Sequence, residues 1–162
     1  MLVISVFAIL FVAVFMDVKT GKIPNVYNGF ILCSGLIYRV VLGDIDGVMQ
    51  GFLGVSIPIL GLFVLFVFGV VGAGDIKLLA GIGAFLGFNI VWVIIYSFLL
   101  CGIFGGILIS VRLIKVLIGG EIRYILAGFL TKKKQYTKVA FSVFILGGYV
   151  WYLAKGGLWN GI

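Results

Sequence analysis

The acidic residues of this chain are the first candidates for chemistry, because the sequence holds five of them and no histidine. Without histidine, a zinc hydrolase and a serine or cysteine nucleophile activated by an imidazole are both excluded. Asp75 stands out, since the stretch 72–87 around it is otherwise apolar except for Lys77. A charge at membrane depth is costly, so an aspartate in such a stretch is a functional candidate that needs a partner elsewhere in the chain.

The composition of the 162-residue chain is that of an integral membrane protein. Hydrophobic residues make up 64%, charged residues make up 10%, and the mean hydropathy is +1.35. A water-soluble domain of this size could not hide so much apolar surface in one core. Apolar runs near the roughly 20 residues that cross a bilayer favour helices over a barrel. The net charge of +7 then indicates orientation and contact with anionic lipids, and no nucleic-acid binding is expected.

We predict one all-α membrane domain over residues 1–162, with six transmembrane helices and both termini outside. The spans are expected at about 2–16, 26–42, 48–71, 76–88, 90–111 and 139–154. The first apolar run precedes its positive charges, whereas a cleaved signal peptide has a basic region before its apolar core, so this helix is expected to be retained. The fourth span would reach only about 20 Å as a helix. If it crosses, the basic segment 112–138 lies on the same side as Lys19 and Lys22, as the positive-inside rule requires.

Most other charged residues fall at or beyond the ends of these spans. Arg39 is expected to reach the membrane interface from the far end of the second span with its long side chain. Asp44 and Asp46 lie in a glycine-flanked turn, where a solvated acidic turn is favoured over a cation site. Glu121 falls in the basic segment 112–138 and is expected to pair with a neighbouring base. We expect that segment to lie along the membrane surface, with its lysines on lipid headgroups or on an acidic partner.

The predicted topology brings Asp17 and Asp75 to the same membrane face, because Asp17 ends the first span and Asp75 precedes the fourth. Asp44 and Asp46 fall at the other face. Two carboxyl groups at a partly desolvated site do not both ionise readily, so one keeps a proton while the other acts as a base. Such a pair can activate water against an amide and protonate the departing nitrogen. Asp17 alone would be read as a helix-end charge at the headgroups, and the pairing with Asp75 favours a catalytic role.

The neighbours of Asp75 suggest supporting tasks. Gly72 and Gly74 allow unusual backbone angles and the close approach of a peptide. A helix beginning at Ile76 would present the positive end of its dipole to the Asp75 carboxylate. Lys77 could favour the charged form of Asp75 or hold a substrate carbonyl, and it could equally be an interface anchor at a helix start.

The glycines and cysteines in the apolar runs indicate how the membrane helices pack against one another. Gly81, Gly83 and Gly87 crowd the fourth span, and small residues let membrane helices approach closely, so this helix is expected to be enclosed by others. Cys33 and Cys101 lie in apolar runs without a CxxC spacing. They are expected to fill helix contacts, and no metal site, disulfide or cofactor is predicted.

Two stretches resemble the signatures of the type IV prepilin peptidase family, aspartic proteases of the GxGD type. The first, residues 17–25, reads DVKTGKIPN, and the second, residues 72–79, reads GAGDIKLL. An aspartate motif that closes one helix together with GxGDxKL opening another is far more specific than GxGD alone. The resemblance covers nearly the whole chain and is less clear over the last helix.

The resemblance implies a membrane endopeptidase that removes the short basic leader of prepilins, pseudopilins or archaellins at the cytoplasmic face of the cell membrane. It implies that Asp17 and Asp75 are the catalytic pair, that Gly72 and Gly74 are the loop glycines, and that Lys77 is the lysine that follows them. The expected partners are single-helix precursors of the prepilin or preflagellin kind. These would have to unwind locally at the cleaved bond, because the hydrogen bonds of a helix shield its amides.

The chain departs from some relatives in two places. Larger members that also methylate the new N-terminus carry a cytoplasmic insert with paired CxxC motifs, which is absent here, so the chain is more similar to the short Flp-type or archaeal-type peptidases. Many relatives have a proline-containing aromatic sequence before the last helix. Residues 135–141 read QYTKVAF instead, which weighs against a substrate-positioning role for that helix.

Two other classes of function stay open from the residues. A small ion or proton-coupled transporter or channel could line its path with Asp75 and Lys77, but it would distribute polar residues through the membrane depth, whereas this chain concentrates them at one face. A scaffold for pilin assembly could bind the same kind of helix without cutting it. The presence of both aspartates favours cleavage over binding alone.

Overall fold

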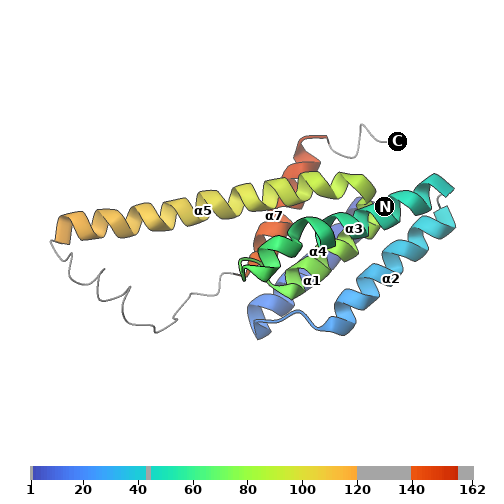
Figure 1. The fold of residues 1–162 in the computed structure, drawn as a ribbon, viewed down its shortest axis with the longest axis horizontal. Coiled ribbons are helices and arrows are strands. Elements are labelled where there is room, and N and C mark those ends of the chain that lie inside the picture. The colour runs from blue at the N-terminus through green and yellow to red at the C-terminus, as the bar shows by residue number, and fades with distance from the viewer. Residues whose placement is uncertain (1, 43–44, 120–139, 157–162) are drawn as a thin grey trace.

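The computed structural model describes residues 2–42, 45–119 and 140–156 of the chain. Figure 1 shows these residues as a helical bundle from which one end of the long α5 projects. The elements in chain order are α1 (Leu2–Thr20), α2 (Asn25–Leu42), α3 (Ile45–Val67), α4 (Ala73–Leu86), the 3-10 turn η1 (Gly87–Asn89), α5 (Ile90–Gly119) and α7 (Phe141–Ala154). Within the described residues, α1, α3 and the run Ala73–Val111 are long and apolar enough to cross a membrane. This all-helical architecture is that of a membrane protein, and the six-span topology with both termini outside stays a prediction.

The ends of α1 and α3 differ from the predicted spans 2–16 and 48–71. α1 continues to Thr20, because Lys19 in its last turn suits the negative end of the helix dipole, and Gly21 then leaves the helix with φ 68°. α3 begins three residues earlier than predicted and ends at Val67, because Gly69 takes φ 70°. The amides of Gly69 and Val70 each donate at 2.9 Å to carbonyls of the last α3 turn, which is the Schellman arrangement.

The fourth helix starts earlier than predicted. The carbonyl of Gly72 accepts hydrogen bonds from the amides of Asp75 at 3.1 Å and Ile76 at 3.3 Å, so α4 begins at Ala73 and not at Ile76. Asp75 therefore lies inside the first turn of the helix. α5 continues past its predicted end at residue 111 to Gly119, which makes the start of the predicted basic segment helical. Residues 120–139 with Glu121 lie outside the described residues, and α7 begins at Phe141.

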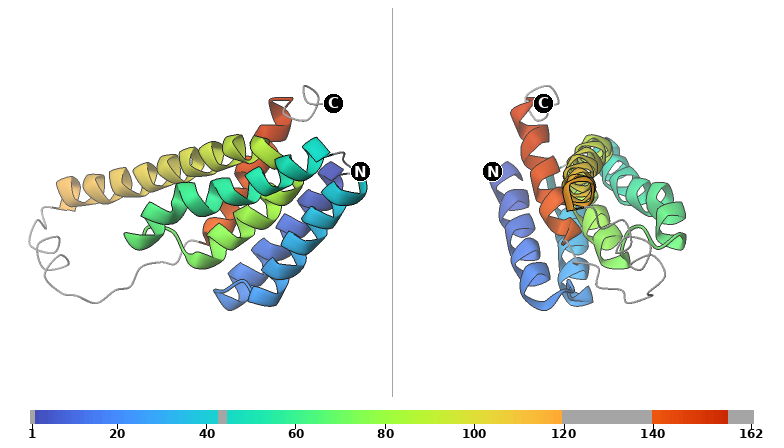
Figure 2. Two further views of the ribbon diagram at one scale, coloured as in Figure 1. Left: turned by 45° about the vertical axis from the view of Figure 1, so that its right-hand side comes forward. Right: turned by 90° about the vertical axis from the view of Figure 1, so that its left-hand side faces the viewer.

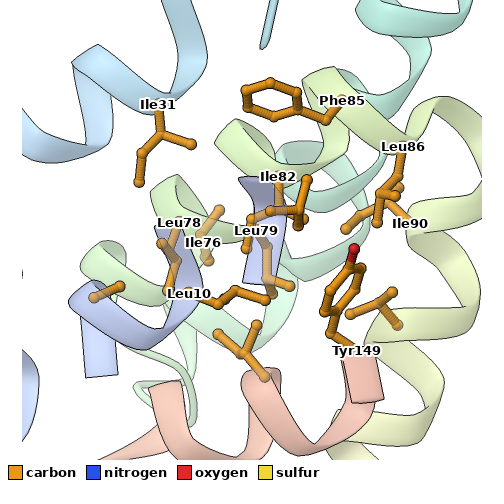
Figure 3. Packing of buried hydrophobic residues seen from close by; sticks show 14 of the residues in the cluster. Leu10, Ile31, Ile76, Leu78, Leu79, Ile82, Phe85, Leu86, Ile90 and Tyr149 are labelled. Atoms are coloured by element: carbon orange, nitrogen blue, oxygen red, sulfur yellow. The ribbon is translucent and has the colours of Figure 1, made fainter. Parts of the chain in front are cut away.

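The prediction that other helices enclose the fourth is confirmed. Ile76 and every residue from Leu78 to Leu86 are buried. In the close view of Figure 3, side chains of α4 face Leu10 of α1, Ile31 of α2 and Tyr149 of α7. Figure 2 shows α1 and α7 on one side of α4 and α3 on the other. α4 is thus the central helix of the core, and its first turn carries Asp75.

The contacts of glycines with neighbouring helices show in which direction the helices run relative to one another. Gly81 packs against Ile31, and Gly35 packs against Ala84, so α2 and α4 run parallel. α3 runs antiparallel to α4, and α1 runs antiparallel to α7. One end of the bundle therefore gathers the end of α1 with the starts of α2, α4 and α7.

The side chain of Arg39, which we predicted to reach the membrane interface, makes a hydrogen bond at the end of α4 that the sequence did not predict. Its Nη2 donates to the carbonyl of Phe85 at 2.6 Å, at the end of α4, while Gln50 Oε1 of α3 accepts the Phe88 amide at 3.1 Å. Gly87 takes φ 63°, and a Cβ there would lie 3.2 Å from Arg39 Nη2. The 14-residue α4 reaches only about 21 Å, so its last carbonyls end inside the bundle, where side chains from neighbouring helices must satisfy them.

Replacing Arg39→Met keeps an apolar stem of similar length and removes the donor to Phe85. We expect the free energy of unfolding to fall by about 1.5–3 kcal/mol, because a buried carbonyl at a helix end loses a charged partner. Thermal unfolding in detergent measures the change. Ile37→Met, at an exposed position of the same helix, is the control and should unfold like the native protein. Equal midpoints for the two variants would show that Arg39 does not stabilise the end of α4.

Candidate active site

Asp17 is positioned by the last turn of α1. Its side chain is half-buried, and its carbonyl accepts the amide of Gly21 at 2.7 Å, which closes the helix. The Thr20 hydroxyl lies 2.8 Å from the carbonyl of Met16 and 2.7 Å from that of Lys22, so it ties the end of α1 to the chain that follows. The hydrogen-bonded last turn of α1 therefore fixes the backbone position of Asp17.

Asp75 is positioned by the first turn of α4, on the most buried helix of the bundle. The Gly72 backbone offers a hydrogen bond to its carboxylate, and Asp17 is close enough for its charge to act on Asp75. A Cβ at Gly72 would lie 3.0 Å from Asp75 Oδ2, so any side chain there would crowd the carboxylate. Gly72 has φ −76°, which any residue adopts, and Gly74 is not among the glycines with positive φ. Neither glycine therefore uses the unusual backbone angles that the sequence interpretation allowed for them. At Gly72 the advantage of glycine is the space it leaves beside the carboxylate.

Asp17 and Asp75 line one pocket with a volume of about 320 Å³. The other lining residues come from the α1–α2 connection, the first residue of α2 and the start of α4, namely Gly21, Lys22, Ile23, Asn25, Gly72 and Gly74. A Cβ at Gly74 would meet nothing within 4 Å, so its backbone faces open space. The pocket thus combines two carboxylates, one ammonium group and accessible backbone at the end of an apolar bundle.

Lys77 does not line this pocket. Its Nζ donates to Asn25 Oδ1 at 3.0 Å, across the contact between α4 and α2. This hydrogen bond joins the end of the first signature stretch to the second, and Asn25 is itself a pocket residue. Lys77 is therefore placed to orient the Asn25 amide, a role that the sequence interpretation of Lys77 did not include.

Ser142 is a site residue that sequence reasoning missed. It lies in the first turn of α7, is fully buried, and donates from Oγ to Asp17 Oδ2 at 2.7 Å. A lone serine in an apolar helix carries no motif, so no sequence signal marked it. Among the remaining acids, Asp46 is exposed in the first turn of α3, and Asp44 lies outside the described residues. Neither belongs to the pocket as the structure describes it.

Comparisons with known proteins identify the family of the chain. The sequence profile described as the type IV leader peptidase family matches residues 4–111, a range that includes Asp17 and Asp75 but not α7. Searches among curated proteins and among solved structures found no match. The profile agrees with the family that the two signature stretches resemble. The chain belongs to the type IV leader peptidase family and is a membrane protease of that general kind.

Proposed function

We propose that this protein is an aspartic endopeptidase that removes the short basic leader of prepilin-like, pseudopilin or archaellin precursors. One observation carries the proposal, namely that Asp17 and Asp75 from two helices line the same pocket. Asp75 and Asp17 are close enough to influence each other, which is the requirement for a pair that shares one proton. Family membership supports a leader peptidase in general, and the two carboxyl groups supply its chemistry.

The proposed reaction uses both carboxyl groups in complementary states. The ionised member takes a proton from a water molecule as the water oxygen attacks the carbonyl carbon of the scissile amide. The protonated member then gives its proton to the amide nitrogen as the carbon–nitrogen bond breaks. Each group ends in the state in which the other began, and the pair returns to its first state by exchanging one proton with solvent. No cofactor or metal enters the proposed scheme.

The surroundings of the pocket suit an extended peptide. Gly72 and Gly74 leave room for a substrate backbone beside Asp75, and Asn25, held by Lys77, offers a polar side chain at the rim. A substrate that arrives as an apolar helix must unwind at the cleaved bond, because helical amides are already hydrogen-bonded. Lys19 and Lys22 lie at this end of the bundle, and by the positive-inside rule we place the pocket at the cytoplasmic face of the cell membrane.

Cleavage of a leader-bearing helix tests the proposal. The purified protein is reconstituted in liposomes with a panel of single-helix precursors that carry short basic leaders. We expect the native protein to shorten at least one precursor at a single bond, read by gel shift and located by mass spectrometry. Asp17→Asn, folded to the same degree, should leave that precursor intact. Intact precursors throughout, or equal cutting by Asp17→Asn, would contradict the proposal and favour a non-cleaving scaffold or a transporter.

A further inference from the structure

The last helix contacts the candidate dyad directly, although it lies outside the residues that the family profile matches. Ser142 Oγ donates to Asp17 Oδ2 at 2.7 Å, a length typical of a hydroxyl donating to a charged oxygen. The serine is fully buried, so water cannot replace this donor without opening the contact between α1 and α7. The hydrogen bond is made to Oδ2, so Ser142 does not engage the other oxygen, Oδ1.

The position of Ser142 is fixed by the packing of α7 on two other helices. Gly148 packs so closely on Val93 and Ser97 of α5 that any Cβ there would overlap them. At the opposite end of the α1 contact, Tyr149 Oη donates to the carbonyl of Val3 at 3.2 Å. α7 is therefore held against α1 at two points along its length. The serine hydroxyl is presented to Asp17 by a rigid element, which is what a positioning group requires.

We propose that Ser142 is a positioning residue that orients the Asp17 carboxylate and holds it as the ionised member of the pair, so that Asp17 is the base and Asp75 the acid. A hydroxyl that donates to a carboxylate favours its charged form and restricts its rotation. Within the described residues no α7 hydroxyl donates to Asp75, whose carboxylate has a hydrogen bond from the Gly72 backbone instead. The inference rests on the proposed function in taking these two aspartates as the reacting pair.

Within the described residues, the charged groups that line the pocket with Asp17 are Asp75 of α4 and Lys22 of the α1–α2 connection. Lys19, on the same helix as Asp17, has its Nζ 5.8 Å from the centre of the Phe15 ring. α7 presents Ser142, a neutral donor, within the described residues. Removing the Ser142 hydroxyl therefore removes one hydrogen bond to Asp17 without altering any of these charges.

Ser142→Ala is the test variant, and Ser34→Ala is its control. The Ser34 hydroxyl donates to the carbonyl of Ile31 in its own helix α2 at 2.8 Å, and it takes no part in the packing of α7 described above. We expect Ser142→Ala to lower kcat about 10- to 100-fold, with a smaller change in KM, and to move the acidic limb of the pH–rate profile to higher pH. Ser34→Ala should cleave like the native protein, and Ser142→Thr, which keeps the hydroxyl, should recover most of the rate.

A spectroscopic measurement tests the contact without relying on cleavage. Infrared difference spectra between the native protein and Asp17→Asn contain the Asp17 carboxylate band. In the Ser142→Ala background this band should shift in frequency, because the hydroxyl no longer donates to Oδ2. An unchanged carboxylate band would overturn the inference, and so would native cleavage with an unchanged pH profile in Ser142→Ala. Failure of the proposed function looks different, because the native protein itself would then leave the precursors uncut.

Discussion

Asp75→Asn is expected to abolish leader cleavage while the protein stays folded. The amide has nearly the shape of the carboxyl group, but it can neither give nor take the proton that the proposed reaction moves. General acid–base groups typically contribute about 10²–10⁴-fold to a rate, so we expect kcat to fall by a factor in that range. The measurement is the initial rate of precursor cleavage in liposomes, with product quantified on gels.

Asp46→Asn is the matched control for this variant. Asp46 also lies in the first turn of a helix, but it is exposed in α3 and does not line the pocket. We expect Asp46→Asn to cleave at the native rate, and both variants to unfold at the native temperature. Cleavage by Asp75→Asn within tenfold of the native rate would exclude Asp75 as the acid.

Gly54→Ala is expected to have the largest effect on stability. Gly54 of α3 and Gly83 of α4 face each other so closely that a Cβ on either would overlap backbone atoms of the other. Backbone atoms cannot move aside as a side-chain tip can, so the two helices must separate along their contact. We expect the free energy of unfolding to fall by about 3 kcal/mol or more, and the yield of folded protein to fall with it. Thermal unfolding in detergent measures this change.

Gly61→Ala provides the comparison on the same helix. Gly61 is exposed, and a Cβ there would meet nothing within 4 Å. The substitution should leave the unfolding temperature unchanged or raise it slightly, because alanine forms helix better than glycine. Equal destabilisation by Gly54→Ala and Gly61→Ala would mean that helix propensity and backbone freedom matter here, and that the α3–α4 contact does not.

The broad architecture was predictable because it depends on local properties of the chain. Long apolar runs predict membrane helices, and the charges between them predict where those helices end. The placement of Asp17 and Asp75 at one end of the bundle follows from counting crossings, and the structure finds both in one pocket. The glycines of the fourth span predicted a crowded helix, and α4 is the most buried element described.

Long-range side-chain contacts were not predictable from the same patterns. The hydrogen bond of Arg39 was not predicted, because nothing in the sequence shows that α4 ends beside it, 46 residues further along the chain. Ser142 is separated from Asp17 by 125 residues and carries no motif. The Lys77–Asn25 hydrogen bond joins two stretches whose individual patterns were visible, but their pairing depends on α2 and α4 running parallel.

The central claim is that Asp17 and Asp75 act as one unit, and comparing single and double variants tests it most directly. Cleavage rates are measured for Asp17→Asn, Asp75→Asn and the doubly substituted protein under single-turnover conditions. Groups that act together are not additive, so we expect all three variants to share the same residual rate. A double variant slower than either single variant by the product of their separate losses would contradict the account, because it would show two independent contributions and no dyad.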